Sequence, residues 1–205
     1  MLRAREFRLW ILCTVLVLGG LVGALTGGAV RATSPQQSYE TLSVIISEVA
    51  WGGTLASTAE WIELYNPGDQ PIVLSGWRLV AGDTDPNILL AGTIPAGGFF
   101  LLEHKDDGTV SDITADQIFS TGSGLSDSGE VLRLFAPDSS LIDTANLDGG
   151  GWPAGTASPY FFSMERVDII PDGPSAWASN NGTVRNGRDA AINRLNGTPK
   201  QFYAL

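Results

Sequence analysis

Short apolar runs, each about the length of a β-strand, alternate with turn-forming residues along most of this chain. After residue 42 the runs are rich in β-branched and aromatic residues, and Gly, Pro, Asn, Asp and Ser separate them. A turn signal about every eight to twelve residues is typical of an all-β sandwich or barrel. No stretch after residue 32 keeps a helical period. The pattern therefore favours strands joined by loops over helices.

The clearest pair of strands is expected to form a hairpin. Residues 61–65 alternate, so that Ile62 and Leu64 share one face and the residues between them share the other. The segment 66–69 contains Pro and Gly, which supply a fixed and a positive φ for a turn. A second strand is expected at residues 72–80. The order strand, turn, strand fits an antiparallel arrangement.

Two of the expected strands show features beyond the alternation of apolar and polar residues. Within 72–80, a bulge at 75–76 would bring Leu74 and Trp77 onto one face. Residues 98–103 are almost continuously apolar, as is typical of a strand that is covered on both faces. Further strands are expected at residues 43–51, 118–119, 130–135, 141–145 and 161–168.

A basic start and a long uncharged stretch occupy the N-terminus. Three arginines precede the stretch 9–30, which carries no charge, and small residues precede Thr33. This layout is typical of a secretory signal peptide. We therefore expect residues 1–32 to be removed on export. The stretch is also long enough to span a bilayer as a helix, so an uncleaved membrane anchor is the alternative.

The rest of the chain is expected to form one domain. Residues 33–42 are polar and read as a linker, and residues 43–205 as a β-sandwich with a loop-rich C-terminal segment from residue 173. Cys13 is the one cysteine and lies in the apolar stretch. The domain therefore has no disulfide and must rely on a hydrophobic core, for which it is long enough.

The charge of the chain narrows the range of partners. The whole chain carries −10, and residues 1–32 hold four arginines and one glutamate, which leaves −13 for the remainder. Such an acidic surface repels the phosphates of nucleic acids and anionic lipids. We expect no nucleic-acid partner and no membrane contact except through residues 9–30. The expected partner is a protein or another component of the cell envelope.

A series of short motifs follows in a fixed order along residues 43–200. The most specific are Glu60-Trp61-Ile62-Glu63-Leu64-Tyr65-Asn66 and Leu74-Ser75-Gly76-Trp77-Arg78-Leu79, and weaker ones lie at 46–49, 94–98, 125–134, 141–143, 163–166 and 196–199. Together they resemble the lamin tail domain family. The resemblance implies an immunoglobulin-like β-sandwich. It also implies an exported bacterial module. Bacterial members of the family are often attached to enzymes such as nucleases.

Two glutamates and two arginines within these motifs are candidates for ion pairs. They are Glu60, Glu63, Arg78 and Arg166. We expect Arg166 to donate to Glu60 or Glu63 and to lock the last strand onto the early hairpin, because the guanidinium fork fits a carboxylate. The alternative, a pair of glutamates acting as general acid and base, lacks other catalytic partners in the sequence.

Carboxylates in loops are the candidates for a metal site. They are Asp83, Asp85, Asp106, Asp107 and Asp112. Oxygen-rich loops suit calcium, although acidic turns are also common on protein surfaces. His104 is the one histidine, and its charged neighbours suggest an exposed strand end. A zinc site would need further nitrogen or sulfur ligands.

Aromatic residues in or near loops could form a surface that binds glycans. The candidates are Trp51, Trp152, Tyr160 and Trp177. The alternative is that they pack in the core or close its ends, as most tryptophans in a sandwich do.

Three functions are compatible with the sequence. The leading hypothesis is a non-catalytic exported module that binds protein or envelope components at the cell surface, or has a structural role there, without a cofactor. The second is an adhesion or glycan-binding module that depends on calcium. The third is a small hydrolase or nuclease, for which the sequence offers no Gly-x-Ser-x-Gly motif.

Overall fold

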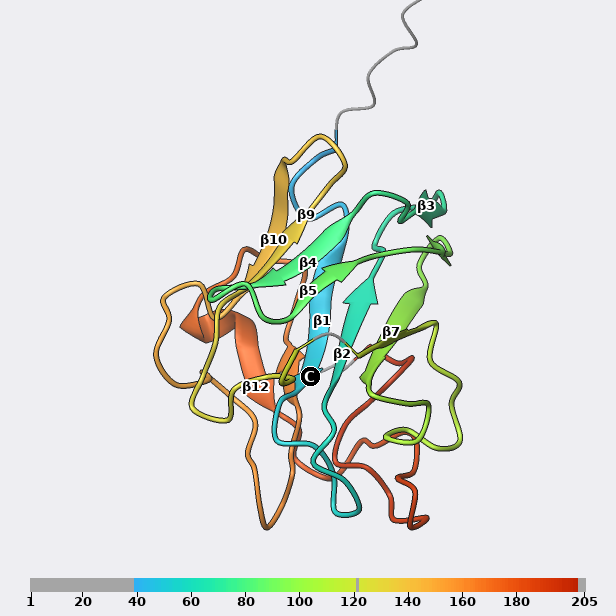
Figure 1. Cartoon of the computed structure of the whole chain (residues 1–205), viewed down its shortest axis with the longest axis vertical. Helices are drawn as coiled ribbons and strands as arrows, with labels where there is room; N and C mark the ends of the chain where they lie inside the picture. The colour runs from blue at the N-terminus through green and yellow to red at the C-terminus, as the bar shows by residue number, and fades with distance from the viewer. Residues whose placement is uncertain (1–38, 121, 203–205) are drawn as a thin grey trace, which may run out of the picture. The chain divides into compact units, whose positions relative to one another are not determined.

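Strands and loops make up the domain that follows the N-terminal segment. The computed structural model describes residues 39–120 and 122–202. A six-stranded sheet has the order β12-β11-β1-β2-β7-β8 (Figure 1). Its strands are β1 (Ile45–Ala50), β2 (Trp61–Tyr65), β7 (Phe99–His104), β8 (Gln117–Phe119), β11 (Met164–Arg166) and β12 (Trp177–Ser179). Only β7 and β8 pair in parallel among them.

A four-stranded antiparallel sheet has the order β10-β9-β4-β5. Its strands are β4 (Arg78–Ala81), β5 (Asn87–Leu89), β9 (Leu132–Phe135) and β10 (Leu141–Ala145). The short strands β3 (Ile72–Val73) and β6 (Thr93–Ile94) form a separate pair, and a single 3-10 turn, η1, covers Pro174–Ala176. The described domain is therefore all-β, as the spacing of the turn residues predicts.

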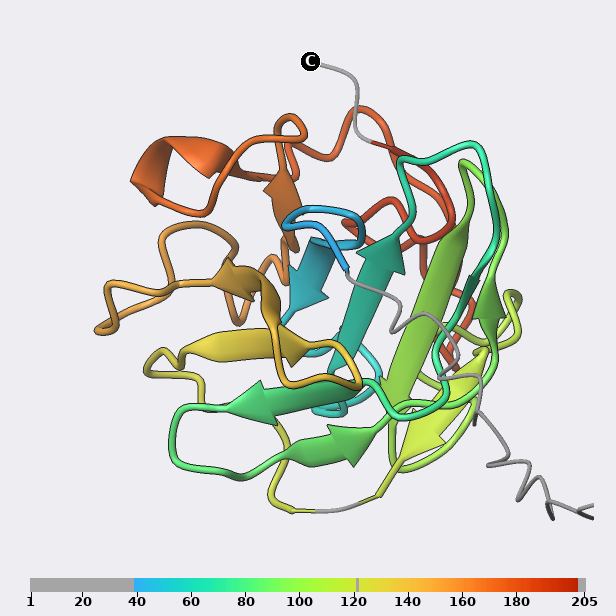
Figure 2. The same cartoon turned by 90° about the horizontal axis from the view of Figure 1, so that it is seen from above.

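The two larger sheets pack face to face around one hydrophobic core. Figure 2 shows the strands of the four-stranded sheet crossing those of the six-stranded sheet. The alternating residues Ile62 and Leu64 of β2 and Leu132 and Leu134 of β9 are fully buried in this core. Because alternate side chains of a strand point to opposite faces, each sheet contributes one apolar face. This confirms the predicted sandwich.

The outer face of the six-stranded sheet is also covered. Trp61 and Leu101 point away from the sandwich core and form a second buried cluster with Val110 and Leu195. Leu195 belongs to the C-terminal segment, which crosses this face after β12. The almost continuous apolar run of β7 is explained by this second covering, as the sequence predicts.

The expected strand at 72–80 is two strands instead of one, and neither pairs with β2, so the predicted hairpin is wrong. β3 and β4 belong to different sheets, and the chain turns sharply between them, with Trp77 N–H donating to the Leu74 carbonyl at 3.0 Å. Gly76 takes φ +85 in this turn, which a residue with a side chain rarely adopts. Leu74 and Trp77 both reach the core, but through a turn and not through the predicted bulge. The prediction also omitted β5, β6 and β12.

The predicted leader at residues 1–32 lies outside the described residues. The end of the predicted linker is described, and there Tyr39 packs edge-on against Trp77 with ring centroids 5.0 Å apart. Leu42 N–H donates to the Ile142 carbonyl at 2.9 Å. Across residues 39–120 and 122–202, no helix is long and apolar enough to span a bilayer.

Candidate functional site

A buried pair of side chains joins the end of β7 to the start of β2. His104 is the last residue of β7, and its Nδ1 lies 2.7 Å from Oε2 of Glu60, which precedes β2. The imidazole stacks on Phe119, with ring centroids 5.1 Å apart. The expectation that His104 is exposed is wrong, because β8 runs beside it and covers the ring.

Gly124 allows the next loop to close over this pair. A Cβ at Gly124 would lie 2.6 Å from Glu60 Oε2 and 2.7 Å from His104 Cε1, and its φ is +88. A side chain at this position would therefore displace one partner. The close approach explains why a glycine stands in this loop, which the sequence marks only as one of several turn residues.

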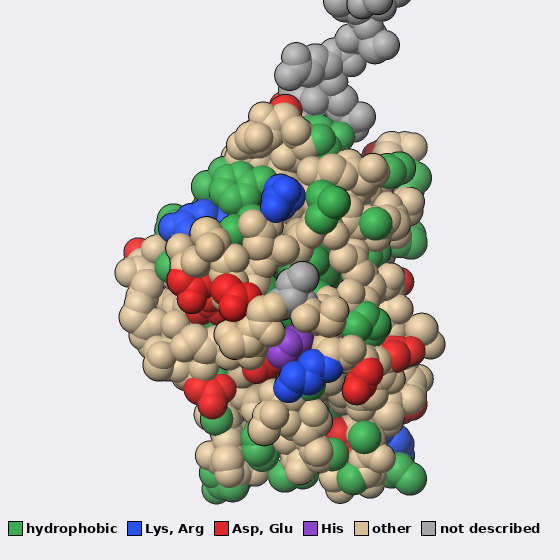
Figure 3. Space-filling view, viewed as in Figure 1, with side chains coloured by type: hydrophobic (Ala, Val, Ile, Leu, Met, Phe, Trp, Pro, Cys, Tyr) green, Lys and Arg blue, Asp and Glu red, His purple; other side chains and the backbone are tan. Residues whose placement is uncertain are grey.

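Glu60 also lines a hollow between four loops, which precede β2, follow β7, follow β8 and precede β11. Its volume is about 610 Å³, within the range of sites for small ligands. Its lining combines hydroxyl groups, charges and one aromatic ring, which belong to Thr58, Ser123, Ser126, Ser158, Lys105, Asp127 and Phe161. The histidine is visible as a small purple area on the face shown in Figure 3.

The pair can act in either of two ways. A carboxylate that holds an imidazole by one nitrogen is an arrangement used to orient a general base. In the described part of the chain, however, no serine hydroxyl donates a hydrogen bond to His104. The same arrangement can also hold Glu60 in place at the edge of a binding site. The polar and charged lining of the hollow suits recognition of a polar ligand.

The four aromatic candidates have different environments. Trp51 and Trp152 stack with centroids 6.1 Å apart, and their Nε1 groups donate to the backbone carbonyls of Ala154 and Ser126. Trp51 and Trp177 are buried, so the prediction of an exposed aromatic surface is wrong for both. Only Tyr160 is largely exposed, at 60%.

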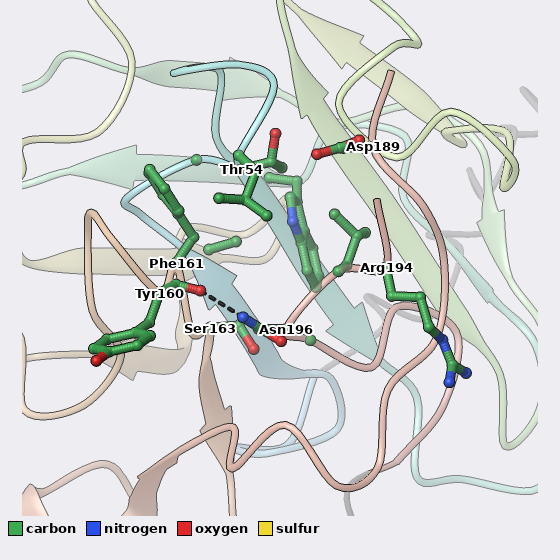
Figure 4. A pocket seen from close by; sticks show the side chains of 13 residues that line it. Thr54, Tyr160, Phe161, Ser163, Asp189, Arg194 and Asn196 are labelled. Atoms are coloured by element: carbon green, nitrogen blue, oxygen red, sulfur yellow. Dashed lines mark hydrogen bonds between the residues drawn. The ribbon is translucent and has the colours of Figure 1, made fainter. Parts of the chain in front are cut away.

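A narrow crevice lies beside Tyr160 and Phe161. Figure 4 shows it between the loop that carries these residues and the C-terminal segment with Arg194 and Asn196. Asn196 Nδ2 donates to the Tyr160 carbonyl at 2.5 Å and joins the two sides. The cavity volume is about 10 Å³, room for about one water molecule. The crevice is therefore too small for an organic ligand.

Arg166 forms an ion pair across the sandwich with Asp143 of β10. It also donates to the Thr144 carbonyl at 3.3 Å, and its guanidinium lies 4.5 Å from the centroid of the Trp177 ring. The prediction that Arg166 donates to Glu60 or Glu63 is wrong. Glu63 points to the outer face of the sheet, whereas Arg166 points into the sandwich. Successive residues of a strand face opposite sides of the sheet, so residues on different strands can also lie on opposite faces.

Arg78 is also not part of a glutamate–arginine network. Its Nη2 donates to Asn87 Oδ1 at 2.6 Å on the exposed side of β4 and β5. Of the four predicted ion-pair residues, Arg166 forms an ion pair, but with Asp143. Glu60 forms a hydrogen bond with His104.

Three glutamates lie side by side on the outer face of the six-stranded sheet. Glu48 is opposite both Glu165 and Glu63 on the neighbouring strands, and all three are buried. The C-terminal segment donates to each of them. Thr198 N–H donates to Glu48 at 2.9 Å, Thr198 Oγ1 to Glu165 at 3.0 Å, and Lys200 N–H to Glu63 at 2.6 Å. We call Glu48, Glu63 and Glu165 the glutamate row, and residues 196–200, which cover it, the strap.

Burial determines the protonation of the glutamate row. Desolvation raises the pKa of Glu63 to about 8, against the lowering effect of the Lys200 N–H group. Desolvation also raises the pKa of Glu48 well above its ordinary value, and the charges of Glu165 and Glu63 add to this. The pKa of Glu165 is raised for the same primary reason. A buried carboxyl group favours the neutral form.

The aspartates proposed for calcium fall into two separate loops. Asp83 and Asp85 lie between β4 and β5, where Asp83 Oδ1 accepts the Asp85 N–H at 2.9 Å. Asp106, Asp107 and Asp112 follow β7, and two of them accept backbone N–H groups. No three His, Cys, Asp or Glu side chains within residues 39–120 and 122–202 are grouped to hold a metal ion.

Several important residues escape sequence-based reasoning. The pattern marks Asp143 only as part of a strand, and Glu48 only as part of a motif. A carboxylate at a position facing inward on an apolar strand is the available signal, because it needs a buried partner. The contacts of Thr198 and Lys200 with the sheet span more than a hundred residues, and no local pattern predicts them.

The arrangement defines a class of protein, an all-β sandwich of the immunoglobulin-like type, whose loops form a hollow at one end. A model of the Lamin Tail Domain matches residues 37–148. The match covers more than half of the 205 residues, so this chain belongs to the lamin tail domain family. No curated protein matches the chain. The family supports a module for binding or structure, while fold alone does not define a function.

Proposed function

We propose that this chain is a non-catalytic exported module that binds a protein or another component of the cell envelope through the hollow beside Glu60. The observation that carries the proposal is the composition of that hollow. Hydroxyl groups, Lys105, Asp127 and the ring of Phe161 converge on a volume of about 610 Å³. Loops on a rigid scaffold are where immunoglobulin-like folds place their binding sites.

The ligand that best fits this lining is an extended polar chain, because hydroxyl and charged groups alternate with one aromatic surface. A segment of polar peptide or of a glycan has that character. The calcium-dependent alternative is less well supported, because the predicted aspartates are divided between two loops and several already accept backbone N–H groups.

Binding of labelled protein to isolated cell envelopes tests the hollow. Thr58 is an exposed residue of the lining, so Thr58→Trp fills the hollow while leaving the core intact. We expect this change to weaken binding at least about tenfold. Val73→Trp is the matched control, since Val73 is 60% exposed on β3, away from the hollow. Equal binding by both variants would refute this site.

The His104–Glu60 pair supports a second candidate function, that of a hydrolase. An activity assay of the unmodified protein tests this candidate. Turnover of an ester, phosphodiester or glycoside that is lost in His104→Ala would contradict the non-catalytic proposal.

Export is tested separately by the intact mass of the protein. A secreted species beginning at or near Thr33 supports cleavage, and a full-length species in the membrane fraction supports the anchor.

A further inference from the structure

One end of the sandwich presents apolar side chains on three different loops. Figure 1 shows these loops at the end opposite to the segment at residues 39–42. Leu55 lies before β2 and is 59% exposed, Tyr160 lies before β11 and is 60% exposed, and Ile192 lies in the C-terminal segment and is 71% exposed. Leu55, Tyr160 and Arg194 surround the same crevice, so the three loops meet there.

Ile192 stands at the tip of a tight hairpin that carries two arginines. Arg188 and Arg194 are bridge partners in antiparallel orientation, and Asp189 N–H donates to the Asn193 carbonyl at 2.9 Å. Like charges directly opposite each other are destabilising. The hairpin pairs two residues of like charge, and an anion bound beside them would reduce their repulsion.

The nearby carboxylates do not neutralise these arginines. Asp189 is buried, and its Oδ1 accepts the N–H groups of Ala191 and Asn193, each at 2.9 Å. Asp112 accepts the backbone N–H of Arg188 at 2.7 Å. Among the described residues, neither Arg188 nor Arg194 takes part in an ion pair. Arg188 Nη1 donates to the Ile192 carbonyl at 2.9 Å.

The C-terminal segment is also basic within an acidic chain. Residues 183–202 contain half of the eight basic residues that follow residue 32, and one acidic residue. At physiological salt the field of a charge is screened beyond about 8 Å. Two of these four basic residues, Arg188 and Arg194, stand in the hairpin itself, and charges that lie farther away than this distance have little effect on them.

We propose that this end of the domain, the arginine tip (Leu55, Tyr160, Arg188, Ile192 and Arg194), rests on the surface of a membrane that contains anionic phospholipids, a contact that the net charge of the domain as a whole does not predict. The planar guanidinium groups fit lipid phosphates. The apolar side chains on separate loops enter the boundary between headgroups and acyl chains, and a tyrosine suits that boundary. A membrane surface offers both chemistries in one plane, whereas a soluble polyanion offers only the first.

A fluorophore placed at the arginine tip tests this contact in the full chain. Ala191→Cys, in a Cys13→Ser background, receives an environment-sensitive label beside Ile192. Val73→Cys carries the same label at the other end of the domain and serves as the matched control. The probe is a vesicle of phosphatidylcholine, with or without about 30% phosphatidylglycerol, to supply anionic headgroups.

We expect a blue shift of the label at residue 191 only with phosphatidylglycerol, and a smaller shift at high salt. Arg194→Gln should weaken vesicle binding about fivefold, and adding Arg188→Gln about thirtyfold in total. Arg194→Gln is the cleaner variant, because the Arg188 side chain donates a hydrogen bond within the hairpin to the Ile192 carbonyl, whereas among the described residues the Arg194 side chain takes part in no ion pair. Ile192→Ser should also weaken binding.

Three results would overturn the proposal. They are an absent shift at residue 191, an equal shift with neutral vesicles, and a shift that Arg194→Gln leaves unchanged. The hollow is not altered by these variants, so its test is independent.

Discussion

A single step along β11 leads from one side of the six-stranded sheet to the other. Glu165 points outward into the glutamate row, while Arg166 points inward to Asp143. Both are buried, yet their partners differ completely. The face of the sheet on which a buried charged residue lies thus determines its partner. The distance in sequence between the two residues matters little.

Removal of the Arg166 side chain should destabilise the domain strongly. Arg166→Ala leaves Asp143 without its cation in the interior, and we expect a loss of about 3–5 kcal/mol in the free energy of unfolding. Urea unfolding of Arg166→Ala, Asp143→Asn and the double variant measures the coupling between the two residues. We expect a coupling well above additivity, because the two groups are in contact.

Glu63 provides the control for this cycle. It lies on the opposite face of the sheet from Arg166 and makes no contact with that site. The cycle between Arg166→Ala and Glu63→Gln should therefore be additive within about 0.5 kcal/mol. Strong coupling with Glu63 and none with Asp143 would show that the described pairing is wrong.

Gly124 offers a second test at this scale. Gly124→Ala places a methyl group against Glu60 and His104, and we expect it to cost about 1–3 kcal/mol beyond the backbone strain. Gly150 has a similar φ of +79, and no atom lies within 4 Å of the position that a methyl group would take there. Gly150→Ala therefore reports the strain alone. Equal unfolding midpoints for the two variants would contradict the close packing over the pair.

The strap at 196–200 acts as a covering element although it has no regular secondary structure. Its residues satisfy three carboxylates through hydrogen bonds from Thr198 and Lys200. A sheet face with three glutamates would otherwise remain open to water. The strap therefore takes the position that a second sheet or a helix takes in other folds, and it does so by polar contacts in place of apolar ones.

The glutamate row should make the domain less stable as the pH rises. The folded-state pKa values of Glu48, Glu63 and Glu165 are raised above their ordinary value. The contribution of Glu63 to stability is thus complete below about pH 4.5 and is lost as the pH rises to about 8, and Glu48 and Glu165 act in the same direction. Each such group removes up to about 1.4 kcal/mol per pH unit. Melting temperatures from pH 5 to pH 8 measure the effect.

A conservative change identifies the group responsible. Glu63→Gln removes one titration, so the decrease in melting temperature between pH 5 and pH 8 should become smaller. Asp69→Asn changes an exposed carboxylate in the turn after β2 and should leave that decrease unaltered. A melting temperature that rises from pH 5 to pH 8 in the unmodified chain would contradict the assignment.

The sequence predicts elements well where apolar residues alternate with polar ones or form a run as long as a strand. The alternation in β2 and β9 and the apolar run of β7 indicate their faces directly. β5, β6 and β12 have two or three residues each, too few for a period to be read. The candidate site is less predictable, because His104 and Glu60 meet only after β7 pairs with β2. Contacts between distant residues have no signature in a local pattern.

The domain as a whole extends beyond the family match. The match ends at residue 148, whereas β11 and β12 lie at 164–179 and complete the six-stranded sheet. β1 has β11 on one side and β2 on the other. The later strands are thus part of the same folding unit as the matched region.

A chain that ends at residue 148 should not fold cooperatively. It would leave β1 as an exposed edge and would uncover the glutamate row and Trp61, which exposes unpaired backbone groups and apolar surface. We expect no sharp thermal transition by circular dichroism. A chain that ends at residue 202 retains every strand of both sheets and the strap, and should melt as the full chain does. A cooperative transition in the shorter chain would contradict this.

The position of β1 between β2 and β11 also governs the order of events when the chain is made and moved. A polypeptide that passes through a translocation channel N-terminus first delivers β1 early, and its partner β11 more than a hundred residues later. Contacts that distant form slowly, because loop closure must precede them. We expect the domain to stay unfolded until nearly all of it has emerged, a behaviour that would be compatible with the export proposed above.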